Sequence, residues 1–295
     1  MASNPLSRAD LAALTERSDA KGLVRLVLHV ATIAAAGAVF AAAFETAWML
    51  PAAWVYGTCL AFLFAPLHET VHYTAFRSRR LNRAVSVTCG WLLGLPPHFF
   101  RAFHLEHHRC TQDPERDPEL AGAPLRTWRQ YLWRVSGAQY WARQFRGIAR
   151  FAAGRVTEPW IPRAERERVV REARTFLASY AAVGVLSLVT GTASLLLWFW
   201  IVPVLLGQPM LRLYLLAEHT GCPMTPDILE NSRTVHTNAL VRLLAWNMPY
   251  HAEHHAYASI PFHALPRAHA ALAPFIRNQP RGYARVHREL ARGLG

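Results

Sequence analysis

Charged residues are scarce in this 295-residue chain, at 17% of the sequence, against about 25% in ordinary globular domains. Hydrophobic residues make up 52%, which excludes an intrinsically disordered protein. Cysteine is scarce too, and no two of the four are close in sequence: they are Cys59, Cys89, Cys110 and Cys222. This spacing excludes a CxxC redox or zinc-ribbon site and a small secreted fold held by disulfide bonds.

Several common sequence signatures are absent. The chain has no GxSxG, Walker A or GxGxxG pattern, so the signatures of serine hydrolases, P-loop proteins and dinucleotide-binding enzymes are missing. A cleaved secretory signal is not expected, because residues 1–22 are polar and the apolar run that follows is too long. With no low-complexity linker in between, we expect a single membrane domain over residues 1–295.

Long apolar runs are the most prominent feature that is present. About 20 apolar residues suffice for a helix to cross a bilayer. On this basis we predict an all-α integral membrane protein with transmembrane helices at about residues 27–44, 48–67, 170–190 and 194–217, arranged as two hairpins. The alternative for each run is a helix buried in a soluble core.

The positive charges alternate with these runs. The net charge is +13, and residues 101–174 alone hold fifteen of the 32 Lys and Arg residues, whereas the expected turns at 45–47 and 190–193 hold none. Positive residues collect on the cytoplasmic side of membranes. We therefore expect both termini to be cytoplasmic and residues 68–169 and 218–295 to form a histidine-rich helical cap there, with no nucleic-acid partner.

Two further apolar stretches are not expected to span the membrane. Residues 84–100 contain two glycines and two prolines, which would break a spanning helix. Residues 126–151 mix aromatic side chains with six arginines, a pattern typical of a helix lying in the membrane interface. The alternative is an amphipathic helix packed on the cytosolic cap.

Eight of the fifteen histidines fall into three clusters. Residues three and four apart share one face of a helix, so each cluster aims two or three imidazoles at one point. All three clusters can meet on the cytosolic side if residues 84–100 do not cross the membrane. Neutral imidazole suits iron, zinc, copper and nickel, so the clusters predict a metal site without naming the metal. The clustered residues are His68, His72, His104, His107, His108, His251, His254 and His255.

The first cluster also matches the HExxH pattern of zinc proteases, in which Glu69 would be the general base. A membrane zinc hydrolase is therefore an alternative. It would leave the two HxxHH clusters, at residues 104–108 and 251–255, without a purpose.

The motifs HxxxH, HxxHH and HxxHH, set between two predicted hairpins, resemble the histidine boxes of the membrane fatty acid desaturase and hydroxylase superfamily. The stretches APLHETVH (65–72), FHLEHH (103–108) and WNMPYHAEHH (246–255) carry the similarity, which covers roughly residues 45–270. The resemblance implies a non-haem centre of two iron ions held chiefly by histidine, with dioxygen as oxidant. It also implies electrons from a separate donor protein of the ferredoxin, rubredoxin or cytochrome type.

The resemblance also implies a ninth ligand near the end of the fourth span. His219 is favoured because it ends the last apolar run, and His236 is the alternative. Carboxylates next to the clusters are candidates for orienting the imidazoles, or else are ordinary solvated charges. These candidates are Glu69, Glu106 and Glu253 beside the ligands, and Asp113 and Asp117 after the second cluster, which resemble acids at that place in relatives.

Oxidising an unactivated C–H bond requires a redox metal, because no side chain supplies such an oxidant. The expected function is O2-dependent oxidation of a lipid or acyl chain, with fatty acyl desaturation favoured. Hydroxylation or ketolation of an alkyl chain or carotenoid on the same scaffold is the alternative. The sequence does not reveal the acyl carrier, the regiochemistry, the donor protein or the oligomeric state.

Overall fold

The computed structural model describes residues 5–122 and 124–295, so residues 1–4 and 123 of the expected single domain lie outside the described part. Over the described residues the fold is all-helical, and backbone pairing outside helices is limited to isolated bridges such as Thr234 with Tyr250. The prediction of an all-α chain is confirmed.

Four helices are long and apolar enough to cross a membrane, as predicted. They are α2 (Asp19–Ala42), the continuous span Met49–Val71 formed by α3 (Met49–Ala61) and α4 (Phe64–Val71), α9 (Arg163–Val189), and the span Ala193–His219 formed by α10 (Ala193–Leu196), the π-helical segment η2 (Leu197–Ile201) and α11 (Val202–His219).

Two of these helices begin about eight residues before the predicted spans. The side chain of Ser18 accepts a hydrogen bond from the backbone N–H of Lys21 and so caps α2 ahead of its apolar part. The first turns of α9 are charged and precede the apolar run. Hydropathy therefore located the apolar lengths correctly, whereas the cap and the polar turns set where each helix starts.

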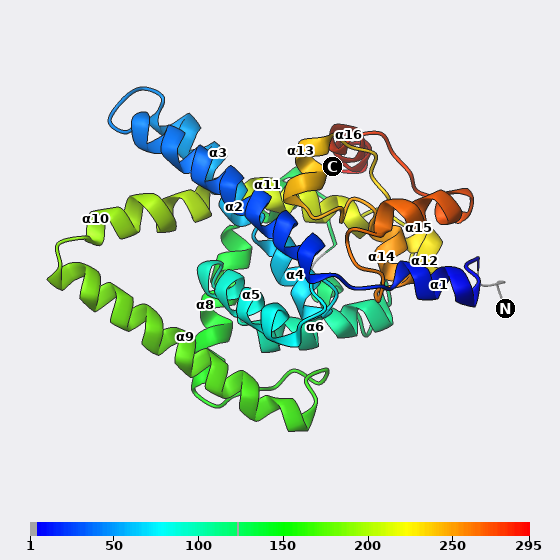
Figure 1. Ribbon diagram of the computed structural model, residues 1–295, viewed down its shortest axis with the longest axis horizontal. Helices are drawn as coiled ribbons and strands as arrows, with labels where there is room; N and C mark the ends of the chain where they lie inside the picture. Colours follow the sequence, from blue (N-terminus) through cyan, green and yellow to red (C-terminus); the bar gives the residue numbers. More distant parts are fainter. Residues whose placement is uncertain (1–4, 123) are drawn as a thin grey trace.

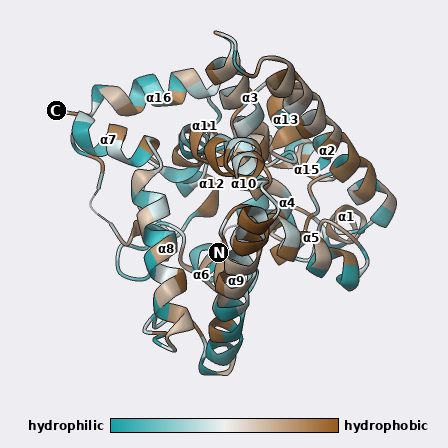
Figure 2. Cartoon of the chain, turned by 90° about the vertical axis from the view of Figure 1, so that its left-hand side faces the viewer, coloured by the Kyte–Doolittle hydropathy of each residue, from teal (hydrophilic) through white to brown (hydrophobic). Residues whose placement is uncertain are grey.

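The apolar helices extend from the rest of the molecule as two arms (Figure 1). The turns at residues 43–48 and 190–192 lie at their tips, on the left of the view. Helix α9 exposes a run of large apolar side chains near its end, including Leu188 at 72% and Val189 at 80%. Figure 2 shows this hydrophobic part of α9 beside α10, while the first turns of α9 are hydrophilic. Exposed apolar area of this extent is typical of a lipid-facing surface.

Helices α3 and α11 form the tightest crossing in the molecule because a glycine lies on each. A Cβ atom added to Gly57 would lie 1.9 Å from the carbonyl oxygen of Pro203, and one added to Gly207 would lie 1.9 Å from that of Gly57. The two backbones are thus in direct contact, as is common where membrane helices pack through small residues. This contact fixes the helix that ends at His219 against the one that leads to His68.

The stretch 84–100 is broken, as expected. Helix α5 (Arg79–Leu92) is followed by a turn in which Gly94 has φ +64°, and α6 (Pro97–Cys110) then begins at a proline. The turn brings α6 back against α4 and α9. Helix α6 carries the second histidine cluster, so this break places the second cluster beside the first.

The prediction of one interfacial helix over residues 126–151 needs correction. Two helices occur there, α7 (Trp128–Val135) and α8 (Ala138–Ala152), because Gly137 between them adopts a left-handed conformation with φ +76°. Both are amphipathic, and Trp133 and Phe145 are more than half exposed. The mixture of aromatic residues and arginines that predicted an interfacial helix is therefore distributed over two short helices.

The remaining described helices are short. They are α1 (Arg8–Leu14), η1 (Pro118–Leu120), α12 (Ile228–Asn231), α13 (Ala239–Leu244), α14 (His251–Ala256), α15 (Leu265–Leu272), η3 (Ala273–Phe275) and α16 (Tyr283–Arg292).

A buried contact connects the segment after α13 to the apolar helices. Trp246 donates a hydrogen bond from Nε1 to Nδ1 of His29 on α2, and His29 Nε2 lies 3.2 Å from the carbonyl oxygen of Cys59 on α3.

The glycine crossing generates a stability prediction. Gly207→Ala forces a methyl group into the backbone of α3, and overpacking of this kind typically destabilises a protein by roughly 1–3 kcal/mol. We expect a lower midpoint of thermal unfolding for the detergent-solubilised variant. Gly184→Ala is the matched control, because a Cβ there meets nothing within 4 Å. Equal unfolding temperatures for the two variants would show that the crossing is not tight.

Candidate metal centre

All three histidine clusters meet in the structure, together with His219 at the end of α11. The first cluster lies at the end of α4, the second on α6 and the third on α14. Histidine ring contacts link all four elements, for example His68 with His104 and His107 with His219. The nine imidazoles then separate into two groups.

Group A comprises five histidines whose ligand nitrogens all lie within 4.8 Å of one another. The Nε2 atoms of His104 and His108 are 3.0 Å apart, and those of His254 and His108 are 3.2 Å apart. Nδ1 of His68 and Nε2 of His72 are buried without a hydrogen-bond partner. The members are His68, His72, His104, His108 and His254.

Group B comprises four histidines. The ligand nitrogens of His107, His219 and His255 lie within 4.8 Å of one another. Nε2 of His251 lies 2.8 Å from Nε2 of His219, which in turn lies 3.2 Å from Nε2 of His107. His251 therefore completes this group.

The hydrogen bonds around group B determine which ring nitrogens carry protons. His107 donates from Nδ1 to Asp117 (2.9 Å), and His219 donates from Nδ1 to the carbonyl oxygen of Asn231 (3.1 Å). The Thr111 hydroxyl donates to the carbonyl oxygen of His107, so His255 donates from Nδ1 to that hydroxyl (3.1 Å). In their neutral forms, all three rings consequently present the lone pair of Nε2 to the same point.

Lone pairs that face each other about 3 Å apart without a proton between them are unfavourable when buried. A cation at their centre removes that cost, and a set of neutral imidazoles suits a divalent transition metal. Nε2 of His255 is also buried and has no hydrogen-bond partner. The residues of group B thus fit a metal ion, and group A fits a second on the same grounds of converging, unpartnered nitrogens.

Burial favours the neutral, metal-binding form of most of these rings. It lowers the pKa of His72 to about 3, and with the neighbouring imidazoles it holds the pKa values of His104, His108 and His254 well below the usual range. The pKa values of His251 and His255 are likewise far below it. At neutral pH no proton competes with a metal at these rings.

His107 is the exception, because carboxylates surround it. Burial lowers its pKa, but Glu119 and Asp117 outweigh burial and raise it overall. Asp117 is held rigidly, since its oxygens also accept hydrogen bonds from the backbone N–H groups of Gln112 and Glu119. It fixes the orientation of His107, as carboxylates do for metal-binding histidines.

The other candidate carboxylates hydrogen-bond elsewhere. Glu69 accepts from the Thr74 hydroxyl and the backbone N–H of Phe262. Glu253 contacts Thr234 and His269. A residue adjacent to a ligand on a helix points about 100° away from it, so these side chains face outward from the histidines.

Glu106, Asp113 and His236 also lie apart from the two groups. Glu106 pairs with Arg109, and Asp113 accepts from the backbone N–H of Glu115. His236 is exposed and packs against the ring of His269. Of the two candidates for a ninth ligand, the structure brings only His219 into contact with the clusters.

Sequence reasoning missed four neighbours of the centre, among them Glu119, whose Oε2 lies 3.8 Å from Nε2 of His107. Oε1 of Glu218 lies 3.3 Å from Nδ1 of His251, and Thr111 and Asn231 orient His255 and His219. Glu218 directly precedes the candidate ligand His219 at the end of an apolar run, so the sequence could have indicated Glu218 as a neighbour of the centre. Thr111 and Asn231 act through contacts between distant segments, which no local motif reveals.

The carboxylate at His107 generates a metal-binding prediction. Asp117→Asn removes the negative charge and replaces one of the two oxygens that face Nδ1 of His107 by an NH2 donor, which favours the other tautomer of His107. We therefore expect about 10- to 100-fold weaker metal retention. The measurement is the metal-to-protein ratio after dialysis against graded chelator. Asp113→Asn is the control, because that carboxylate supports only its own turn. Equal metal retention in both variants would contradict this role for Asp117.

Comparison with curated proteins identifies similar sequences. The chain is 24% identical to the sphingolipid delta(4)-desaturase DES1 of Homo sapiens over 243 residues, 79% of this chain and 68% of the relative. It is 24% identical over 258 residues to the sn-1 oleoyl-lipid 12-desaturase of Anabaena variabilis, covering 76% and 69% of the two chains. It is 28% identical over 244 residues to the dihydrorhizobitoxine desaturase of Bradyrhizobium elkanii, covering 75% and 66%.

A family model provides the decisive match. The fatty acid desaturase model matches residues 45–287, a range that contains all nine clustered histidines and three of the four apolar helices in full. This confirms the resemblance carried by the histidine motifs. The chain belongs to the fatty acid desaturase family.

Proposed function

We propose that this protein uses two iron ions and dioxygen to oxidise an unactivated C–H bond in a lipid or acyl chain, most directly by desaturation. The main observation in support of this proposal is the pair of adjacent groups of converging histidines. The similar proteins are desaturases by name, which favours desaturation over hydroxylation or ketolation of an alkyl chain or carotenoid.

Each group is proposed to hold one iron ion. His68, His72, His104, His108 and His254 would hold the first; His107, His219, His251 and His255 would hold the second. When bound, the iron pair supplies the redox chemistry that activates dioxygen and removes hydrogen from carbon. The chain itself keeps the rings neutral by burial and fixes their tautomers through hydrogen bonds. Aromatic side chains exclude water, for example Phe100, whose ring centre lies 5.3 Å from that of His104.

The orientation of Glu69 argues against the zinc hydrolase alternative. In the HExxH mechanism the glutamate must reach the water bound to the metal. Glu69 is fully buried and hydrogen-bonded to Thr74 and to the backbone of Phe262 instead. This hydrolytic reaction would therefore lack its general base.

The proposed topology is multi-pass, with two hairpins and a cytosolic cap. Four apolar helices of membrane length support it, as does the absence of Lys and Arg from the turns at residues 45–47 and 190–193. Both termini and the metal centre would be cytoplasmic, in a single domain of 295 residues. A separate ferredoxin, rubredoxin or cytochrome-type protein would deliver the electrons.

Histidine substitutions test the metal assignment. We expect both His254→Ala, which removes a ligand of group A, and His255→Ala, which removes a ligand of group B, to lower the iron content of the protein. Both should reduce product formation by orders of magnitude, because two metals act together. His236→Ala is the control, since this exposed histidine lies outside both groups. One tightly held zinc per chain and no iron, or an active His255→Ala variant, would refute the proposal.

Product analysis distinguishes desaturation from oxygenation. Membranes that contain the protein and its electron donors are supplied with 18O-labelled dioxygen, and the lipids are examined by mass spectrometry. Desaturation predicts new double bonds with no 18O in the organic product. Incorporation of 18O into the product would show that the reaction is hydroxylation and not desaturation. Lipids that the protein leaves unchanged would contradict both reactions.

A further inference from the structure

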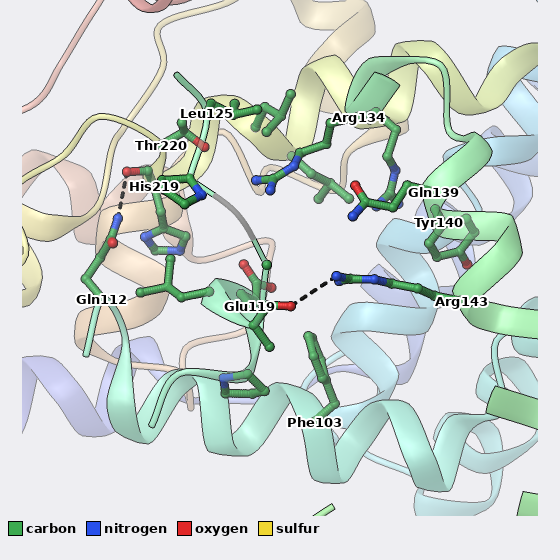
Figure 3. A pocket seen from close by; sticks show the side chains of 18 of the residues that line it. Phe103, Gln112, Glu119, Leu125, Arg134, Gln139, Tyr140, Arg143, His219 and Thr220 are labelled. Atoms are coloured by element: carbon green, nitrogen blue, oxygen red, sulfur yellow. Dashed lines mark hydrogen bonds between the residues drawn. The ribbon is translucent and has the colours of Figure 1, made fainter. Parts of the chain in front are cut away.

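A cavity of about 1530 Å³ opens beside group B. Figure 3 shows His219 at one side of it and side chains from α7 and α8 at the other. Helix α11 also contributes Arg212 and Leu215 to the wall, and α6 contributes Phe99, Phe100 and Phe103. The cavity therefore connects solvent-accessible space with a proposed metal-binding ring.

Arginine dominates the charged lining of this cavity. Two of its three lining glutamates are paired locally, Glu158 with Arg150 and Glu289 with Arg285. Glu119 is the remaining carboxylate among the described lining residues. Against this one carboxylate, the wall carries arginines of α7, α8 and α11, namely Arg134, Arg143, Arg146 and Arg212. This part of the cavity consequently carries an excess of positive charge.

Arg212 differs from the other three arginines in its place in the sequence. It lies within the apolar span Ala193–His219, where ionised side chains are costly and usually functional. Its Nε is buried and has no hydrogen-bond partner among residues 5–122 and 124–295, and its guanidinium lies 4.4 Å from the centre of the Tyr140 ring. A guanidinium with a buried, unpartnered N–H is suited to an acceptor that arrives with a ligand.

Arg134 and Arg143 reinforce the positive charge nearby. A Cβ atom placed on Gly122 would lie 3.3 Å from Nη2 of Arg143 and 3.6 Å from Nη2 of Arg134, so the two guanidiniums flank the same point. Burial lowers the pKa of Arg134 and the charge of Arg143 lowers it further, while the carboxylate of Glu119 acts in the opposite direction. An anion between them would relieve this repulsion, because charge-assisted hydrogen bonds to guanidinium are among the strongest in proteins.

Another part of the wall is aromatic. Phe99, Phe100 and Phe103 line it, and Phe100 stacks on His104 of group A. Arg212 and His219 are seven residues apart on α11, which places them on one face and separates them by about 10 Å along the helix axis. The cavity thus has a cationic end and an aromatic side that leads to the histidines.

We propose that this cavity binds the substrate through an anionic group, a carboxylate or a phosphate at the end of its alkyl chain, and that Arg212 is the anchor. This inference rests on the proposed function. Arg134 and Arg143 assist the anion, and the phenylalanines hold the chain. The oxidised carbon then lies at a distance from the anion that is set by α11.

The test measures binding rather than turnover. Iron-loaded protein in nanodiscs of neutral phosphatidylcholine is titrated calorimetrically with hexanoate, hexyl phosphate and hexanol, with empty nanodiscs as the blank. We expect one or both anions to bind at least about tenfold more tightly than hexanol, since hydrogen bonds to charged groups contribute more than neutral ones. The two anions distinguish a carboxylate substrate from a phosphate-bearing one.

Three variants locate the site. Arg212→Gln should lose about tenfold or more in anion affinity while hexanol binding stays unchanged. Arg143→Gln should also bind the anions more weakly, but with a smaller loss of affinity. It is the substitute test variant if Arg212→Gln does not fold. Arg288→Gln, an exposed arginine on α16 that does not line the cavity, is the control.

Equal affinities for hexanol and the anions, or anion binding that survives both cavity substitutions, would overturn the proposal. Loss of anion binding in Arg212→Gln with retention in Arg288→Gln supports it. Iron content and lipid products, measured on the same wild-type preparation, report on the proposed function separately. Anion binding that depends on Arg212 in a protein without oxidative activity would leave the anion site standing and refute only the reaction.

Discussion

Nine imidazoles converge in two groups in the interior of this protein. Their lone pairs repel one another, so other groups of the protein must hold the rings in this orientation. In group B that support is explicit. Asp117, the backbone of Asn231 and the hydroxyl of Thr111 each engage an Nδ1 and leave the corresponding Nε2 facing inward. The histidines alone would not hold this arrangement, because converging acceptors gain nothing from each other.

The rest of the fold supplies the rigidity that these contacts require. The glycine contact between α3 and α11 sets the relation between His68 and His219, two residues that belong to different groups. The hydrogen bond between Trp246 and His29 attaches the segment before α14 to the first apolar helix. The geometry of the two histidine groups therefore depends on the packing of the apolar helices.

Much of this arrangement was predictable because it follows from local periodicity. The i, i+3 and i+4 spacing of the histidines and the four apolar runs identified the clusters and the helices. What the sequence did not reveal was how the clusters divide. On α6, His104 and His108 join group A whereas His107 joins group B, because a single residue step rotates a side chain by about 100°. The break at Gly137 and the partners of Glu69 and Glu253 also depend on contacts between distant segments.

Two helices contribute to both histidine groups. Helices α6 and α14 each carry members of group A and group B, while α4 contributes to group A alone and α11 to group B alone. An ion that orders α6 and α14 in one group also pre-arranges ligands for the other. If each group holds the ion proposed for it, the two binding equilibria are thermodynamically linked, and the linkage is reciprocal. Ordering of the shared helices by the first ion would then favour binding of the second.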